Sequence, residues 1–164
     1  MRVLELLYFM VPAYVANMAP PFVRYWKGWN RPISPRWLGS HKTVVGFVAG
    51  VFAAVLVAFL QSRLGWGGTI ADYGGWLDLG VRMGTGAMLG DTVKSFFKRR
   101  RGVAPGGTWI PFDQLDFVVG ALLFVWPRAA LAWTDVVIVL ALSFAGHILV
   151  NHIGYWLGVR DAKW

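Results

Sequence analysis

Long apolar runs alternate with short charged segments along this chain. Residues 43–62 and 136–159 contain no charged side chain. A transmembrane helix needs about 20 consecutive apolar residues to cross the hydrocarbon core of a bilayer. Both runs reach that length, so the pattern predicts two membrane-spanning helices.

Three further runs are apolar but interrupted. Residues 3–20 carry Glu5 and contain Pro12, which a membrane helix tolerates when its neighbours satisfy the backbone carbonyl that the proline leaves free. Residues 79–97 and 114–133 carry internal charges. These are Arg82, Asp91 and Lys94 in the first run, and Asp116 and Arg128 in the second. Together the runs predict an all-α integral membrane protein with five transmembrane helices.

The loop charges predict an orientation. Five spans place the termini on opposite sides, and Lys and Arg concentrate on the cytoplasmic side. With the N-terminus outside, four cations fall outside: Arg2, Arg63, Arg82 and Arg128. The other twelve fall inside: Arg24, Lys27, Arg31, Arg36, Lys42, Lys94, Lys98, Arg99, Arg100, Arg101, Arg160 and Lys163. We therefore expect one transmembrane domain, 1–164, with an outside N-terminus, a cytoplasmic C-terminus and cytoplasmic loops at about 21–42 and 98–113.

Composition narrows the class of protein. The 164-residue chain is 57% hydrophobic and carries a formal charge of +8, whereas soluble domains are only about half apolar. The absence of cysteine excludes disulfides, thiolate metal sites and a cysteine nucleophile. The positive charge suits anionic headgroups or a polyanionic substrate. Nucleic acid is not expected as a partner, because the cations flank apolar spans and no nucleic-acid-binding module is recognisable.

Small and polar residues inside the spans predict helix contacts. Gly46 and Gly50, and likewise Gly86 and Gly90, have the four-residue spacing that lets helices approach closely in lipid. Gly90 alternatively makes room for a ligand. Buried polar groups in the first and last spans most simply form structural hydrogen bonds, because the two histidines lack the i, i+4 spacing of a helical metal pair. These groups are Asn17, His147, Asn151 and His152.

One face of the third predicted span is ionic. Asp91, Lys94, Ser95 and Lys98 recur at i, i+3, i+4 and i+7, which places them on one side of a helix. Charge inside a membrane is costly and usually faces a wet cavity or a functional site. The alternative is a salt bridge between Asp91 and Lys94, with the later cations marking the cytoplasmic end.

A glycine and proline loop follows, and then two carboxylates. The loop contains Gly102, Pro105, Gly106 and Gly107, and by itself such a loop is usually just a turn. Asp113 and Asp116 stand three residues apart at the start of the fourth predicted span. Helix capping would explain one of them. Together with Asp91 they would supply three convergent carboxylates, which suit Mg²⁺ beside substrate phosphates.

A second basic element precedes the second predicted span. Lys42 and Thr43 are followed by Gly46, but the glycine frame and the strand of a Walker A motif are missing. A lysine and a threonine at a helix start can still hold an anion. A positive membrane anchor with a threonine cap is an equal alternative.

These motifs together resemble the membrane cytidylyltransferases that make CDP-activated lipids. The order is Gly90-Asp91, Lys94-Ser95, Lys98-Arg99, the glycine and proline loop, and the string Asp113-Gln114-Leu115-Asp116. Bacterial and eukaryotic members have arginine where this chain has Gln114. The glutamine, the small size and the Lys42-Thr43-Gly46 element resemble the archaeal branch, the CDP-archaeol synthases.

The resemblance implies a reaction and a site. CTP and an isoprenoid ether lipid phosphate would give CDP-archaeol and pyrophosphate with Mg²⁺, at a site facing the cytoplasm of the cell membrane. Asp91, Asp113 and Asp116 would hold the metal and, with Lys94, form the catalytic set. The residues expected to bind CTP are Lys42, Thr43, Gly46, Lys94, Ser95, Lys98, Arg99 and Gln114.

Other readings make different predictions. An anion-conducting or lipid-binding membrane protein would explain the basic loop but not the three carboxylates, which anion paths avoid. A cytidylyltransferase acting on ester-linked phosphatidic acid remains open, as does the oligomeric state. The Asp-Gly-x-x-Ala-Arg string of the CDP-alcohol phosphotransferases does not occur in this chain.

The orientation is testable with reporter fusions. A reporter fused at Trp164 should be active only when it is of the type that works in the cytoplasm, because the C-terminus is expected on the side rich in Lys and Arg. Activity of the complementary reporter, which works only on the outer face, would show that the orientation is reversed.

Overall fold

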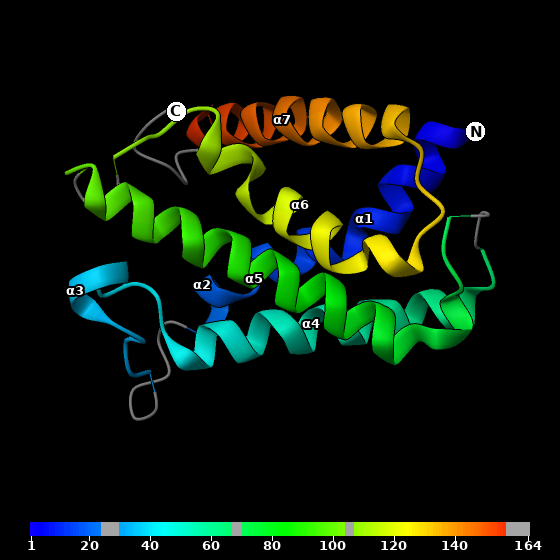
Figure 1. The fold of residues 1–164 in the computed structure, drawn as a ribbon, viewed down its shortest axis with the longest axis horizontal. Helices are drawn as coiled ribbons and strands as arrows, with labels where there is room; N and C mark the ends of the chain where they lie inside the picture. The colour runs from blue at the N-terminus through cyan, green and yellow to red at the C-terminus, as the bar shows by residue number, and fades with distance from the viewer. Residues whose placement is uncertain (24–29, 67–69, 104–106, 157–164) are drawn as a thin grey trace.

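The computed structural model describes residues 1–23, 30–66, 70–103 and 107–156, and every regular element in these ranges is helical. The long helices are α1 (Arg2–Met18), α4 (Val44–Leu64), α5 (Trp76–Arg100), α6 (Phe112–Val125) and α7 (Trp133–Trp156) (Figure 1). Short elements connect them: α2 (Pro20–Val23), α3 (Pro35–Leu38), η1 (Tyr73–Gly75) and η2 (Trp126–Arg128). The all-α prediction is confirmed.

The fourth long helix is shorter than the sequence pattern predicts. The expected span over 114–133 is replaced by α6, which has 14 residues and ends at Val125, and by the 3-10 turn η2. Pro127 lies in that turn, and a proline cannot donate the backbone hydrogen bond that would continue the helix. At 1.5 Å per residue, α6 is about 21 Å long, less than the roughly 30 Å of a bilayer core.

Within the described residues, three helical segments are long and apolar enough to cross a membrane. They are Arg2–Val23, Val44–Leu64 and Trp133–Ile153. The chain is thus a membrane-embedded helical protein. By length and composition α5 and α6 do not qualify, so the count of five spans stays a prediction, and residues 157–159 of the predicted last span lie outside the described ranges.

Helix α5 lies between α4 and α6 (Figure 1). On one side, an added Cβ at Gly80 or Gly84 would collide with the α4 backbone. On the other side, Gly86 abuts the Gly120 carbonyl and Gly90 abuts the Asp116 carbonyl of α6. The predicted packing role of Gly86 and Gly90 is confirmed, and this contact sets where the start of α6 lies beside α5.

Ion pairs gather at the end of the bundle where α1 and α7 begin. Arg2 binds Asp135 at 2.5 Å, and Asp78 pairs with both Arg82 and Arg128, at 2.8 and 3.0 Å. The start of α4, the end of α5 and the start of α6 lie at the opposite end (Figure 1). The described cations that were predicted inside and those predicted outside are therefore separated along the bundle, although the membrane orientation itself stays a prediction. Arg24, Lys27, Arg160 and Lys163 lie outside the described residues.

The glycine contact between α5 and α6 predicts a specific sensitivity. Gly90→Ala should destabilise the protein by about 1–3 kcal/mol, because the methyl group overlaps the Asp116 backbone and the helices cannot separate freely. Thermal unfolding in detergent measures the effect. Gly146→Ala is the matched control, because no atom lies within 4 Å of a Cβ built there; equal stability losses in the two variants would contradict the prediction.

Candidate active site

Helices α5 and α6 bring three carboxylates around one lysine. The Lys94 Nζ lies 3.3 Å from Asp91, 3.1 Å from Asp113 and 3.0 Å from Asp116. Asp91 and Lys94 share a face of α5, as their spacing predicts, while Asp113 and Asp116 come from the first two turns of α6. The close contact of Gly90 with the Asp116 backbone positions these two faces against each other.

A second lysine of α5 holds Asp113. The Lys98 Nζ donates to both carboxylate oxygens at 2.8 Å, and the backbone N–H of Trp109 donates to Oδ2 at 2.6 Å. Burial raises the pKa of Asp113, but the hydrogen bond from Lys98 and the charge of Lys94 outweigh it and hold that pKa below its usual range. Asp113 therefore stays ionised, tied to the end of α5.

The third lysine comes from the segment before α4. The Lys42 Nζ binds the Asp91 carboxylate. Thr43 caps α4, since its Oγ1 accepts the Gly46 N–H at 3.1 Å, and an isolated bridge pairs Thr43 with Pro32. The threonine cap considered from the sequence is confirmed. It holds the adjacent Lys42 where its side chain reaches Asp91 of α5.

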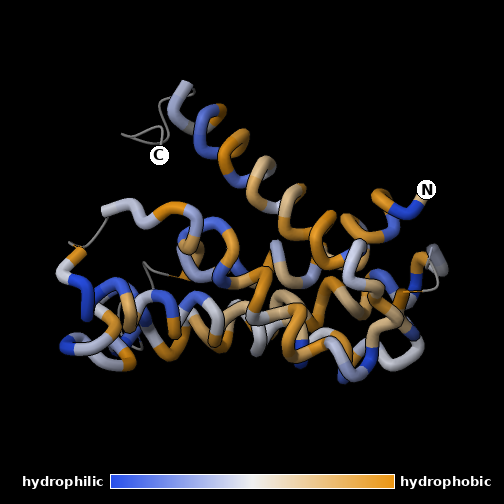
Figure 2. Tube along the Cα trace, turned by 45° about the horizontal axis from the view of Figure 1, so that its top comes forward, coloured by the Kyte–Doolittle hydropathy of each residue, from blue (hydrophilic) through white to orange (hydrophobic). Residues whose placement is uncertain are grey.

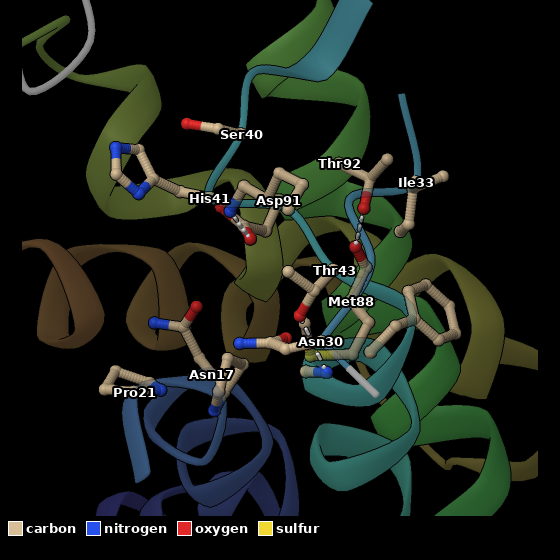
Figure 3. Close-up of a pocket in the computed structure, with 14 residues that line it drawn as sticks. Asn17, Pro21, Asn30, Ile33, Ser40, His41, Thr43, Met88, Asp91 and Thr92 are labelled. Carbon is tan, nitrogen blue, oxygen red and sulfur yellow. Dashed lines mark hydrogen bonds and ion pairs between the residues drawn. The ribbon is translucent and has the colours of Figure 1, made fainter. Parts of the chain in front are cut away.

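A polar cavity of about 530 Å³ opens beside this cluster. Of the residues expected to bind CTP or metal, Lys42, Thr43, Gly46 and Asp91 line it. In Figure 3, Asp91, Thr43 and Thr92 approach from one side and Asn17 from α1 on the other. The cavity also has lining residues that the sequence motifs did not identify: Asn30, Ser40, His41, Met88 and Thr92.

The remaining predicted residues do not line the cavity. Ser95 is buried, and its Oγ donates to the Asp91 carbonyl one turn earlier at 2.8 Å. Gln114 is 3% exposed, and its Oε1 accepts no hydrogen bond from the described residues. Arg99 is half-buried near the end of α5. The structure thus gathers the predicted set at one end of the bundle without exposing every member.

The carboxylates have the chemistry of a site for a hard cation. Asp91, Asp113 and Asp116 supply only oxygen donors, which Mg²⁺ prefers. The Asp116 side chain is 5% exposed, and its Oδ2 accepts no hydrogen bond from the described residues, although Lys94 faces it. The three carboxylates are arranged around Lys94, and no three acidic or histidine side chains of the described ranges are placed to hold a metal ion. The magnesium assignment therefore stays a prediction.

An apolar cavity of about 580 Å³ lies on the other side of Asn17. Its walls come from α1, α2, α7 and Phe117 of α6, and two of its lining residues, Tyr14 and Ser143, share a hydrogen bond of 2.8 Å. His147 and Asn151, 3.1 Å apart, also line it, so their predicted hydrogen-bonding role is confirmed. Asn17 and Pro21 belong to both cavities.

Comparison with known proteins identifies the family. The family described as CarS-like, CDP-archaeol synthase, matches residues 1–164. This chain belongs to that family. A CDP-archaeol synthase of Methanospirillum hungatei is 37% identical, covering 94% of this chain and all of the relative. That of Thermococcus kodakarensis is 32% identical, covering 96% of this chain and 94% of the relative.

The fold is similar to that of a solved structure. A structure described as an intramembrane enzyme for archaeal membrane lipid biosynthesis has a TM-score of 0.69 and 29% identity, covering 91% of this chain and 94% of that one. The resemblance read from the motifs is confirmed by these matches, and so is the prediction of a membrane nucleotidyltransferase. A purely conducting channel is not supported.

Proposed function

We propose that this member of the CarS-like family transfers the cytidylyl group of CTP to an isoprenoid ether lipid phosphate, giving CDP-archaeol and pyrophosphate. One observation carries the proposal. Three carboxylates and three lysines, drawn from α5, α6 and the segment before α4, meet beside a polar cavity, and an apolar cavity adjoins it.

The reaction requires positioning more than proton transfer. An oxygen of the lipid phosphate forms a bond to the α-phosphorus of CTP, and the bond from that phosphorus to the bridging oxygen breaks. The electron pair leaves with pyrophosphate. A phosphomonoester is already an anionic nucleophile near neutral pH, so no side chain has to act as a base. Catalysis of this type rests on alignment and on neutralising charge.

The lysines and the carboxylates divide this task. Lys94 and Lys98, with Ser95 and Arg99 nearby, would neutralise the triphosphate. Asp91, Asp113 and Asp116 would hold Mg²⁺, which would supply positive charge to offset the negative charge of the triphosphate and of the departing pyrophosphate. Four further residues would bind the nucleotide. They are Lys42, Thr43 and Gly46, which line the cavity, and Gln114, which is buried outside its lining.

The apolar cavity is the place that we assign to an isoprenoid chain. It lies between α1 and α7, and Figure 2 shows α7 diverging from the rest of the bundle toward its C-terminal end. A chain in this cavity would hold its phosphate near Asn17, at the boundary with the polar cavity. The proposal keeps the predicted five spans, with the N-terminus outside and the polar cavity facing the cytoplasm.

A direct assay tests the reaction. Purified protein incubated with CTP, Mg²⁺ and the ether lipid phosphate should release pyrophosphate, and an ester-linked phosphatidic acid should react more slowly. Asp116→Asn should lower turnover at saturating Mg²⁺ by at least about tenfold, since even indirect partners of a metal have effects of that size.

Asp72→Asn is the control for that substitution. Asp72 is exposed and caps η1, and asparagine caps equally well. It should retain wild-type turnover. Absence of pyrophosphate with every lipid phosphate would contradict the proposed function, whereas full activity of Asp116→Asn would contradict only its metal assignment.

The assignment of the apolar cavity to the lipid chain predicts that a substitution there affects the KM for the lipid phosphate but not the KM for CTP. Gly146→Phe should raise the KM for the lipid phosphate several-fold and leave the KM for CTP unchanged, because Gly146 lines the apolar cavity and space is open around it. Leu149→Phe, at a position 60% exposed on the same helix and outside that cavity, is the control. A rise in the KM for CTP, or equal effects of the two variants, would contradict the assignment.

A further inference from the structure

The lysines of the cluster differ in how many carboxylates they contact. Within the described residues, Lys42 pairs with Asp91 alone and Lys98 with Asp113 alone. Lys94 pairs with Asp91, Asp113 and Asp116, all within 3.3 Å. Its side chain is 15% exposed. One ammonium therefore occupies the point on which all three carboxylates converge.

That point is where a divalent cation would have to bind. Magnesium takes its oxygen ligands at 2.0–2.1 Å, so an ion shared by these carboxylates cannot occupy the same space as the Lys94 ammonium. The two positive charges would also repel each other in a partly buried site. The Oδ2 atom of Asp116 is buried and lies 3.0 Å from the Lys94 Nζ, so the ammonium is the positive charge that this oxygen faces in the present arrangement.

We propose that Lys94 is an internal counter-ion that holds the metal position closed until nucleotide arrives. In the absence of nucleotide, a Lys94 ammonium that moved away from the three carboxylates would lose its counter-ions while still partly buried. When CTP is bound, its triphosphate would supply a replacement anion nearby. Metal and nucleotide then bind as a pair, each weakly alone. By linkage, each raises the affinity for the other by the same factor. This inference rests on the proposed function and adds an order of events to it.

Metal binding without nucleotide tests the inference. Mn²⁺, which accepts the same oxygen ligands as Mg²⁺ and is visible by electron paramagnetic resonance, is titrated into the purified full-length protein in detergent, with no CTP and no lipid. Wild-type protein should bind it weakly. Lys94→Gln should bind it at least about tenfold more tightly, because the competing ammonium is gone while the three carboxylates remain.

Two further variants separate competition from a structural effect. Lys94→Arg keeps the positive charge and should bind Mn²⁺ as weakly as the wild type. Lys98→Gln removes an equally buried cation of the same helix that contacts one carboxylate, and it should change the affinity by less than about threefold. Loss of structure alone would weaken metal binding in every variant, so only competition predicts the gain in Lys94→Gln.

Two outcomes of the Mn²⁺ titration would contradict the role proposed for Lys94. Wild-type protein that binds Mn²⁺ as tightly as Lys94→Gln, or a loss of affinity in Lys94→Gln, would overturn the inference. If that variant does not fold, Lys94→Gln combined with Asp113→Asn restores the charge balance and should still bind more tightly than Lys94→Arg combined with Asp113→Asn. The proposed function is judged separately by pyrophosphate release from the wild type, so the two can fail independently.

Discussion

The close approach of α5 and α6 is the contact on which the rest of this site depends. Gly86 and Gly90 allow the backbones to touch at Gly120 and Asp116, where any larger residue would hold the helices apart. Because the contact includes the Asp116 backbone itself, the same glycine that packs the helices also places a carboxylate opposite Lys94. Packing and site geometry are thus one feature of the sequence.

The balance of charge explains how such a cluster persists in a largely apolar protein. Three carboxylates buried together would repel one another strongly, but each is matched by a lysine. A buried pair gains little net stability over an apolar one, yet removing one partner is costly. The cluster therefore adds little net stability, and in the proposed function its charges would serve to bind a polyanion.

Much of this site follows from local sequence, since helical spacing alone puts Asp91, Lys94 and Lys98 on one face and Thr43 at a cap. Spacing does not say which lysine is central, because that depends on how α6 packs. The apolar pattern also overestimated the length of the fourth predicted span. Apolar composition continues past Val125, but the helix α6 ends there because Pro127 follows in a 3-10 turn. Asn17 could be identified from the sequence as a polar residue in an apolar run. No sequence pattern identified His41, which lines the polar cavity because of how the segment before α4 folds.

The boundary shared by the two cavities has a consequence for what happens after the chemistry. Asn17 and Pro21 stand where the polar space ends and the apolar space begins. In the proposed reaction, pyrophosphate would depart into water while the nucleotide-bearing lipid, anchored by its hydrocarbon, would depart sideways into the bilayer. The two products would be separated by solvent preference as soon as they form, and this physical partition would oppose their recombination at the enzyme.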